Sequence, residues 1–420
     1  MTPHGFSPTA GTLGNPAYRR LMASTLVSYG ARFLDATMLS WLVVQRTEDP
    51  LPVALLSFFG FVPFLAMGPS AGLVADRLPR LRVMRWAQAG LAGLAVAMAG
   101  LLFAGALEVW HAYAYALCQG LLLVLDSTSR RTYMAGTVGR AHVTAAVSLD
   151  MLGMTVARIL FANAGGALLG ASRPRWAYLV LAGMALASAL LTRGLPPLFA
   201  GGRDSHRESL LTAVKGGLRF ARENRLVLGG LMLVALANLT AFAYEPMVPA
   251  VADDVFHVSP ALFGLFLSAT SIGSLATSLW LALGGKRLAR PGLTGLVAAA
   301  GLHGLQIAFS YADTVGPSLA LLAAIGAVGM VFSISHSSLF LVAAPDALRG
   351  RVLGLQTLMI GAYPLCTLAV GWLGNKLGAL AAVRMVALAG VVWVVALAAL
   401  VPELRQRVGR RDGVGEPEAA

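Results

Sequence analysis

Charged residues are scarce in this sequence. Asp, Glu, Lys and Arg make up 12% of its 420 residues, whereas 57% are hydrophobic, and the mean hydropathy is +0.73. Soluble domains carry about 25% charged residues. The composition therefore excludes a soluble enzyme with a large core and indicates an integral membrane protein.

Cysteines are also few, and so are groups of residues spaced to bind a metal or to form a catalytic site. Cys118 and Cys366 lie in apolar runs, so the sequence predicts small core residues and no disulfide or metal framework. His303 and His336 lack acid or cysteine neighbours at ligand spacing, which favours satisfied core residues over metal ligands. No G-x-x-x-x-G-K-[ST] loop and no nucleophile with a base is present, so neither an ATP-driven pump nor an enzyme is indicated, and no cofactor is expected.

Long apolar runs dominate what remains. A hydrocarbon layer about 30 Å thick needs about 20 apolar residues per helix. The sequence predicts twelve such spans, an all-α membrane fold, near 20–44, 52–75, 83–106, 109–129, 142–170, 174–195, 226–250, 260–284, 292–312, 316–340, 351–375 and 379–401.

The basic residues follow the predicted loops. The net charge is +13, which would suggest nucleic acid if it formed one patch. Most of the 32 Lys and Arg residues instead fall in the loops on one side of the membrane. The positive-inside rule then places both termini in the cytoplasm and removes the argument for nucleic acid.

A polar segment divides the spans into two sets of six. We expect a cytoplasmic tail over 1–18, a six-helix bundle over 19–195, a linker over 196–225, a second bundle over 226–402 and a disordered tail over 403–420. The stretch SLLTAVKGGLRFAREN in the linker has the apolar spacing of a helix lying on the membrane surface or of a solvated linker helix. Two similar stretches that begin with Gly-Arg indicate a repeat: GRAHVTAAVSL at 139 and GRVLGLQTLMI at 350. A repeat of this length predicts two similar halves with a substrate site between them.

The loop between the second and third spans carries a specific motif. It reads GLVADRLPRLR and resembles the G-x-x-x-D-R-x-G-R-R element of the major facilitator superfamily at Gly72, Asp76, Arg77 and Arg80, with Pro79 and Leu81 as departures. The resemblance extends over nearly the whole chain. It implies a cytoplasmic latch between the halves, to which Gly350 and Arg351 at the eleventh span would contribute; a basic loop that only sets topology is the alternative.

Finer details resemble the subgroup of enterobactin exporters and macrolide efflux proteins. They include NPAYRRLMASTLVSYGARFLDATMLSWLV, FVPFLAMGPSAGLVADR and RGRVLGLQTLMIGAYPL, although Phe161 and Ala162 stand where exporters often have Gly-Pro. The resemblance implies proton-coupled efflux of an amphipathic small molecule, such as a siderophore or antibiotic, across the inner membrane. Import of such a compound, or a non-transporting sensor, are the alternatives, and the oligomeric state stays open.

Ionisable residues inside membrane spans indicate a function, because inserting each charged side chain into the bilayer costs roughly 2.5 to 3.5 kcal/mol. Arg32 and Asp35 are three residues apart and share a helix face with Tyr29. We expect this face to line a central cavity, with Asp35 titrating protons and Arg32 adjusting its pKa or meeting an anionic substrate. A structural ion pair between Arg32 and Asp35 is the alternative.

Five further charged residues are candidates. Asp150 and Arg158 lie too far apart on one helix to pair, so each needs another partner; Arg158 is assigned to the cavity or to interhelix pairing, and Asp150 to the inner gate. Asp126 and Arg130 are assigned to the cytoplasmic gate, and capping or local pairing between them is the alternative. Glu245 is assigned to a proton entry from outside, or to a solvated position at the mouth.

Overall fold

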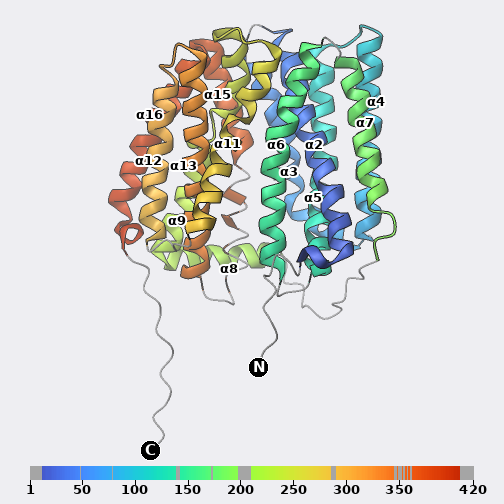
Figure 1. The fold of residues 1–420 in the computed structure, drawn as a ribbon. Coiled ribbons are helices and arrows are strands. Elements are labelled where there is room, and N and C mark those ends of the chain that lie inside the picture. Colours follow the sequence, from blue (N-terminus) through green and yellow to red (C-terminus); the bar gives the residue numbers. More distant parts are fainter. Residues whose placement is uncertain are drawn as a thin grey trace, which may run out of the picture.

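The computed structural model describes residues 12–47, 49–77, 79–138, 142–171, 174–196, 210–284, 290–344, 348, 352, 355–356, 358–359 and 362–406. Side chains at 68–77, 143–145, 210–214, 282–284 and 341–342 lie outside this description. In the described ranges the regular elements are all helices, which run side by side as two groups (Figure 1).

The first group, here called the N-terminal half, contains six long helices. They are α2 (Pro16–Val44), α3 (Pro50–Arg77), α4 (Arg80–Phe103), α5 (Val109–Val138), α6 (Val143–Gly170) and α7 (Pro174–Leu191). Local sequence sets their starts: Asn15 caps α2 by accepting hydrogen bonds from the backbone N–H groups of Ala17 at 2.9 Å and Tyr18 at 3.3 Å.

The second group, the C-terminal half, follows the short helix α8 (Leu210–Glu223). It contains α9 (Arg225–Leu236), α11 (Pro260–Gly284), α12 (Pro291–Phe309), α13 (Val315–Ala343), α15 (Tyr363–Leu377) and α16 (Ala379–Leu400), with the turn η5 (Pro402–Arg405) after it. The helix predicted in the linker is thus present as α8. It lies across the end of the bundle where α2 begins and α16 ends, which we call the terminal side (Figure 1).

The helix that begins with α9 is broken in its second part. The short segments η2 (Ala237–Ala241), η3 (Glu245–Met247), α10 (Val248–Ala250) and η4 (Val251–Val255) follow, because Pro246 and Pro249 lack the N–H that a regular helix needs. Neighbouring helices satisfy the exposed backbone: the Gln306 side chain donates to the carbonyl of Ala241. The break places Glu245 on an irregular turn.

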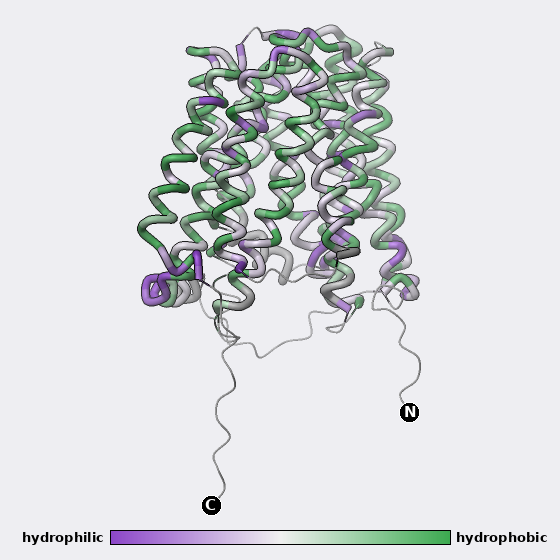
Figure 2. The backbone as a smooth tube through the Cα atoms, turned by 60° about the vertical axis from the view of Figure 1, so that its left-hand side comes forward, coloured by the Kyte–Doolittle hydropathy of each residue, from purple (hydrophilic) through white to green (hydrophobic). Residues whose placement is uncertain are grey.

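The helices match the apolar runs closely, and nine segments of the described chain are long and apolar enough to cross a membrane. The α2 and α5 helices, which are not among these nine, have 29 and 30 residues and are also long enough to span a membrane. The predicted count of twelve spans and the cytoplasmic termini stay predictions. Hydrophobic residues predominate along the height of the helices (Figure 2). Trp280 is 71% exposed, as a lipid-facing side chain would be.

The two cysteines and His303 were all predicted to lie in the core, and the structure confirms two of the three. Cys366 is buried as predicted, but Cys118 is exposed on α5, so its assignment to the core was wrong. An apolar run cannot by itself distinguish a lipid-facing position from a core one. His303 is fully buried, and its ring nitrogens bond the Ala299 carbonyl at 2.6 Å and the Thr240 hydroxyl at 2.8 Å, as expected of a satisfied core residue.

Two contacts join the halves along their length. The α6 helix packs against α11, and α3 packs against α15. One large hydrophobic core lies among α2, α3, α4, α5, α6 and α7. A second lies mainly among the helices that follow α8, and Ala54 of α3 and Trp41 of α2 pack into its edge. The polar residues that lie between the halves are therefore walls of a shared space rather than parts of a common core.

Candidate functional site: a cavity between the two halves

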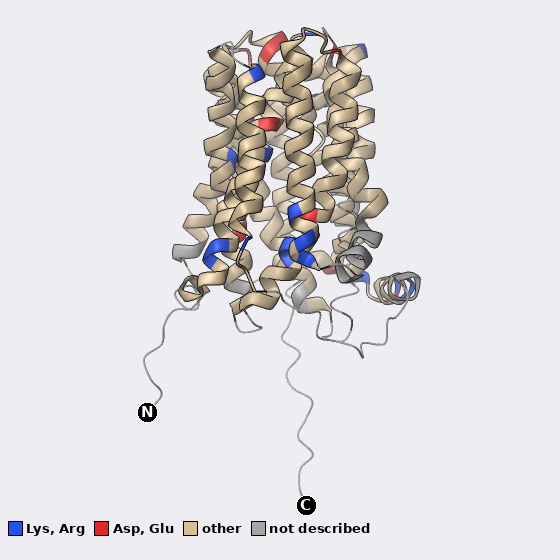
Figure 3. Cartoon of the chain, turned by 90° about the vertical axis from the view of Figure 1, so that its right-hand side faces the viewer, with Lys and Arg blue, Asp and Glu red and all other residues tan. Residues whose placement is uncertain are grey.

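A cavity of about 270 Å³ lies between the halves. The N-terminal half contributes residues of α2, α3, α5 and α6, and the C-terminal half contributes Glu245, Pro246, Pro249, Leu267 and Tyr363. Four charged side chains that the sequence assigned to substrate or proton binding line this cavity: Arg32, Asp35, Arg158 and Glu245. Few charged residues lie at mid-height in the bundle (Figure 3), which makes this group conspicuous.

Asp35 is almost completely buried, with 2% of its surface exposed. Its two oxygens accept hydrogen bonds from α5: the Tyr115 hydroxyl donates to Oδ1 at 3.0 Å, and the Gln119 amide donates to Oδ2. The ion pair between Arg32 and Asp35, which was the alternative interpretation, is not formed in this structure. The i, i+3 spacing does put Arg32 and Asp35 on one helix face. The Asp35 carboxylate nevertheless takes its hydrogen bonds from Tyr115 and Gln119 of α5 rather than from Arg32.

Arg32 and Arg158 approach one aromatic ring from two helices. The guanidinium carbon of Arg32 lies 5.9 Å from the centroid of Phe33, and that of Arg158 lies 6.0 Å from the same centroid. Within the described part of the chain, no carboxylate is within 4 Å of either guanidinium. Of the two roles open for Arg158, the structure supports the cavity wall rather than an interhelix ion pair.

Glu245 faces these residues from the other half. It lies on η3, and the Tyr363 hydroxyl of α15 approaches its Oε2 at 3.5 Å, a long hydrogen bond. Tyr363 in turn packs edge-to-face on Phe61 of α3, with 5.2 Å between ring centroids. Glu245 is thus a half-buried wall residue of the cavity, coupled to the α3–α15 contact between the halves.

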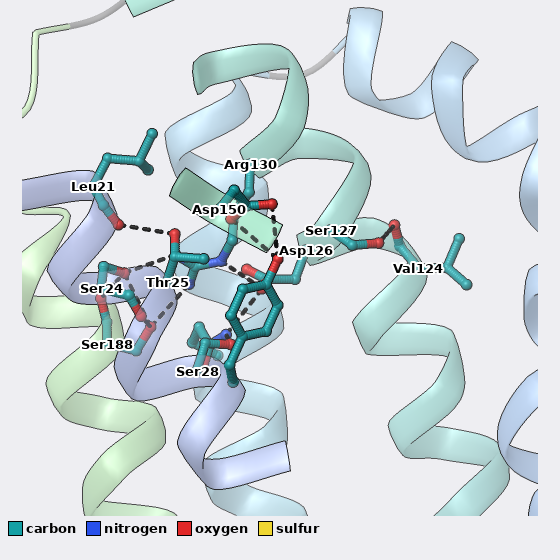
Figure 4. Close-up of polar contacts among 12 residues, drawn as sticks. Leu21, Ser24, Thr25, Ser28, Val124, Asp126, Ser127, Arg130, Asp150 and Ser188 are labelled. Carbon is teal, nitrogen blue, oxygen red and sulfur yellow. Dashed lines mark hydrogen bonds and ion pairs between the residues drawn. The ribbon is translucent and has the colours of Figure 1, made fainter. Parts of the chain in front are cut away.

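A separate polar cluster lies inside the N-terminal half toward the terminal side (Figure 4). Arg130 Nε donates to Asp126 Oδ2 at 2.6 Å, and both side chains are nearly buried. The Gln88 amide also donates to this Asp126 oxygen at 3.1 Å and to the Ser28 hydroxyl at 2.9 Å. The local pairing considered for Asp126 is therefore formed, and its other oxygen, Oδ1, is buried without a hydrogen-bond partner.

Arg130 makes a second contact to α2 and extends the cluster to α7. Its terminal nitrogens donate to the hydroxyls of Ser24 and Ser188, each at 2.8 Å, so α2, α5 and α7 are linked through one guanidinium (Figure 4). The sequence analysis missed Gln88, Ser24 and Ser188. Isolated hydroxyl and amide residues in apolar runs are the only sequence signal for them, and such residues are too common to single out.

Tyr29 differs from its prediction. Its hydroxyl donates to Asp150 Oδ1 and Oδ2 at 3.2 and 3.1 Å, so it belongs to the terminal-side cluster rather than to the wall of the central cavity. Asp150 does find a partner outside its own helix, as its spacing from Arg158 required. The physical reason is helix geometry: Tyr29 lies about 4.5 Å nearer the terminal side than Arg32, at the level of Asp150.

Small cavities connect these polar groups. One of about 40 Å³ is lined by Tyr29, Asp126, Arg130 and Asp150, and one of about 30 Å³ by Gln88, Asp35 and Gln119. Each has room for little more than water. Arg32 lines both of them and also the central cavity, so it lies where the terminal-side cluster and the central cavity meet.

The predicted latch cannot be followed in the structure. The side chains of Gly72, Asp76 and Arg77 at the end of α3 lie outside the described residues, as do Gly350 and Arg351. Arg80 is the first residue of α4 and is half-exposed. A cytoplasmic gate built from these residues stays a prediction.

The opposite side carries close contacts between the halves. A Cβ on Gly166 of α6 would lie 2.5 Å from the Pro260 carbonyl oxygen of α11, and one on Gly371 of α15 would lie 2.4 Å from Ala54 Cβ of α3. Hydrogen bonds from Asn163 to Ser268 at 2.8 Å and from Gln45 to Asp253 at 2.9 Å join the halves on this side. The structure therefore represents a state in which the halves are closed together there.

A sequence profile of the transmembrane secretion effector family of the major facilitator superfamily matches residues 6–412, nearly the whole chain. The chain belongs to this family. It is thus a multi-pass transporter of the inner membrane, as its apolar helices also require.

Two curated relatives resemble this transporter at low identity. The enterobactin exporter EntS of Shigella boydii is 26% identical over 361 residues, which cover 82% of this chain and 81% of EntS. The uncharacterized MFS-type transporter YfiS of Bacillus subtilis is 23% identical over 261 residues, 61% of each protein. Export is the stated function of EntS alone, so the direction and the cargo of this transporter belong to the proposal below.

Solved transporter structures share its fold. A POT family transporter bound to 5-aminolevulinic acid aligns with a TM-score of 0.68 at 12% identity, covering 92% of this chain and 97% of that one. The nucleoside transporter NupG aligns with a TM-score of 0.64 at 15% identity, covering 92% and 99%. At such identities the likeness establishes the fold of the transporter alone.

Proposed function

We propose that this transporter exports an amphipathic small molecule, such as a siderophore, an antibiotic or another secondary metabolite, by alternating access coupled to protons. One observation carries the proposal: a cavity with charged and aromatic walls lies between two halves that are closed together on one side. A site enclosed by two bodies that rock about it can face each side of the membrane in turn. The similarity to the enterobactin exporter EntS favours the outward direction.

Asp35 is our choice for the proton-binding group. It is buried, it borders both the central cavity and the 30 Å³ cavity, and its hydrogen bonds come from neutral donors rather than from a cation. A carboxyl without a cationic partner can take up a proton without breaking an ion pair. Glu245, on the other half, is a second candidate for the same cycle.

Inverted membrane vesicles test this proposal. Vesicles holding the transporter are acidified inside, and uptake of a panel of amphipathic metabolites is followed by mass spectrometry with and without a protonophore. Export by proton exchange predicts uptake that the protonophore abolishes. Uptake only into right-side-out vesicles would instead indicate import.

Paired variants assign the proton role. Asp35→Asn should abolish the dependence of uptake on the pH gradient, because an amide cannot titrate. Asp313→Asn, in an exposed loop on the opposite side, serves as the control and should transport normally. Unchanged proton dependence in Asp35→Asn would remove Asp35 from the mechanism, and binding of a metabolite without flux would favour a sensor.

A further inference from the structure

Two positive charges of the central cavity have no negative partner among the residues that the structure describes. Arg32 and Arg158 both lie about 6 Å from the Phe33 ring, and neither forms an ion pair within the described chain. Two cations that share one aromatic ring repel each other, and the ring face offsets only part of the lost hydration. Such an arrangement is stable when an anion joins it.

The carboxylates of the cavity are not placed to be that anion. Both oxygens of Asp35 are held by Tyr115 and Gln119 of α5. Glu245 belongs to the other half and lies beside Tyr363. Among the described residues, these two acids are the other charged groups that line the cavity. The counter-charge for the arginines is therefore left to a bound molecule.

The rest of the wall indicates what that molecule carries besides its charge. Next to the two arginines lie the rings of Phe33, Phe61 and Phe64, and the aliphatic side chains of Val53 and Leu56. An apolar, partly aromatic body would pack on these side chains while its acidic group reached the guanidiniums.

Resting on the proposed function, we infer that the central cavity binds an amphipathic anion, with Arg32 and Arg158 as the groups that select its charge. A carboxylate, sulfonate, phosphate or catecholate group would accept hydrogen bonds from both guanidiniums. Arg32 and Arg158 are then specificity-determining residues of the transporter.

A consequence concerns the driving force. In a cell whose interior is electrically negative, an anion is driven outward by the membrane potential, by a factor of roughly 50 in concentration per 100 mV for one charge. Export of an anion thus draws on the potential as well as on any proton gradient.

Two dyes with the same xanthene rings test the inference. Sulforhodamine B is a net anion, and rhodamine 6G is a cation; binding of each to the full-length purified transporter is measured by fluorescence anisotropy. We expect a clear preference for sulforhodamine B. Arg32→Gln and Arg158→Gln should each weaken its binding roughly 10- to 100-fold, the loss of one charge-assisted contact, and leave or improve binding of rhodamine 6G.

Control variants distinguish the loss of positive charge from a general loss of folding. Arg32→Lys and Arg158→Lys keep the charge and should retain most of the affinity, whereas Arg46→Gln, exposed outside the cavity, should change nothing. Equal or absent binding of both dyes, or sulforhodamine binding that neither glutamine variant weakens, would overturn the assignment. Anion binding that is retained while proton-driven uptake fails would instead contradict the proposed coupling alone.

Discussion

At the scale of single residues, the buried ion pair between Asp126 and Arg130 is the interaction that most clearly stabilises the N-terminal half. It lies among α2, α4, α5 and α7, with four neutral side chains bonded to it. Removal of one partner leaves a charge buried without compensation. The pair therefore holds the N-terminal half together, whatever part it also takes in a transport cycle.

This predicts a large loss of stability in Arg130→Ala. We expect the free energy of unfolding to fall by about 3 to 5 kcal/mol, measured by thermal denaturation of the purified protein in detergent. Arg225→Ala is the matched control, because Arg225 meets Glu403 at 3.4 Å with 66% of its side chain exposed; it should cost about 0 to 1 kcal/mol. Equal losses in the two variants would contradict the structural role.

Sequence reasoning found most of the charged residues of the site but few of their partners. Arg32, Asp35, Arg158 and Glu245 could be selected because a charge in an apolar run is costly. Tyr115, the partner of Asp35, is 80 positions away along the chain. Helix periodicity relates residues within one helix only, so which helix supplies a donor depends on packing that the pattern does not encode.

At the scale of elements, the closure on the opposite side depends on glycine. Gly166 and Gly371 allow α6 to touch α11 and α3 to touch α15 with no room for a Cβ. Their function in packing became visible only when α11 was placed beside α6, because the two helices are separated by α7, α8 and the broken α9 segment.

A larger side chain at Gly166 should therefore force the halves apart. In a background without Cys118 and Cys366, Ser40→Cys places a thiol on the cavity wall. Gly166→Val should speed its reaction with a membrane-impermeant maleimide added from the opposite side, by about tenfold or more if closure loses 1.4 kcal/mol.

The control for this test is Gly183→Val on α7, where an added Cβ meets nothing within 4 Å. It should leave the labelling rate of the Ser40→Cys thiol unchanged. If Gly166→Val also left that rate unchanged, the contact between α6 and α11 would not be the barrier on this side.

At the scale of the whole molecule, the spans were predictable because bilayer thickness fixes their length, and the predicted 260–284 coincides with α11. The break after α9 was not predicted, because two prolines in an apolar run do not show which neighbours will satisfy the freed backbone. The Gln306 amide, which does so, comes from α12.

The charge bias of the loops predicts the orientation in the membrane. Described Lys and Arg residues gather toward the terminal side (Figure 3). In the cysteine-free background, Asp313→Cys should react with an impermeant maleimide in intact cells, and Gln406→Cys should react only after the membrane is permeabilised. The reverse pattern would invert the topology and with it the proposed direction of transport.

The central claim is that two halves rock about one charged cavity, and paired distances test it most directly. Spin labels at Arg46→Cys and Val255→Cys report the opposite side, and labels at Arg82→Cys and Arg290→Cys report the terminal side, measured by double electron–electron resonance. On lowering the pH or adding sulforhodamine B, we expect one distance to lengthen as the other shortens. Distances that stay fixed, or that change together, would contradict alternating access.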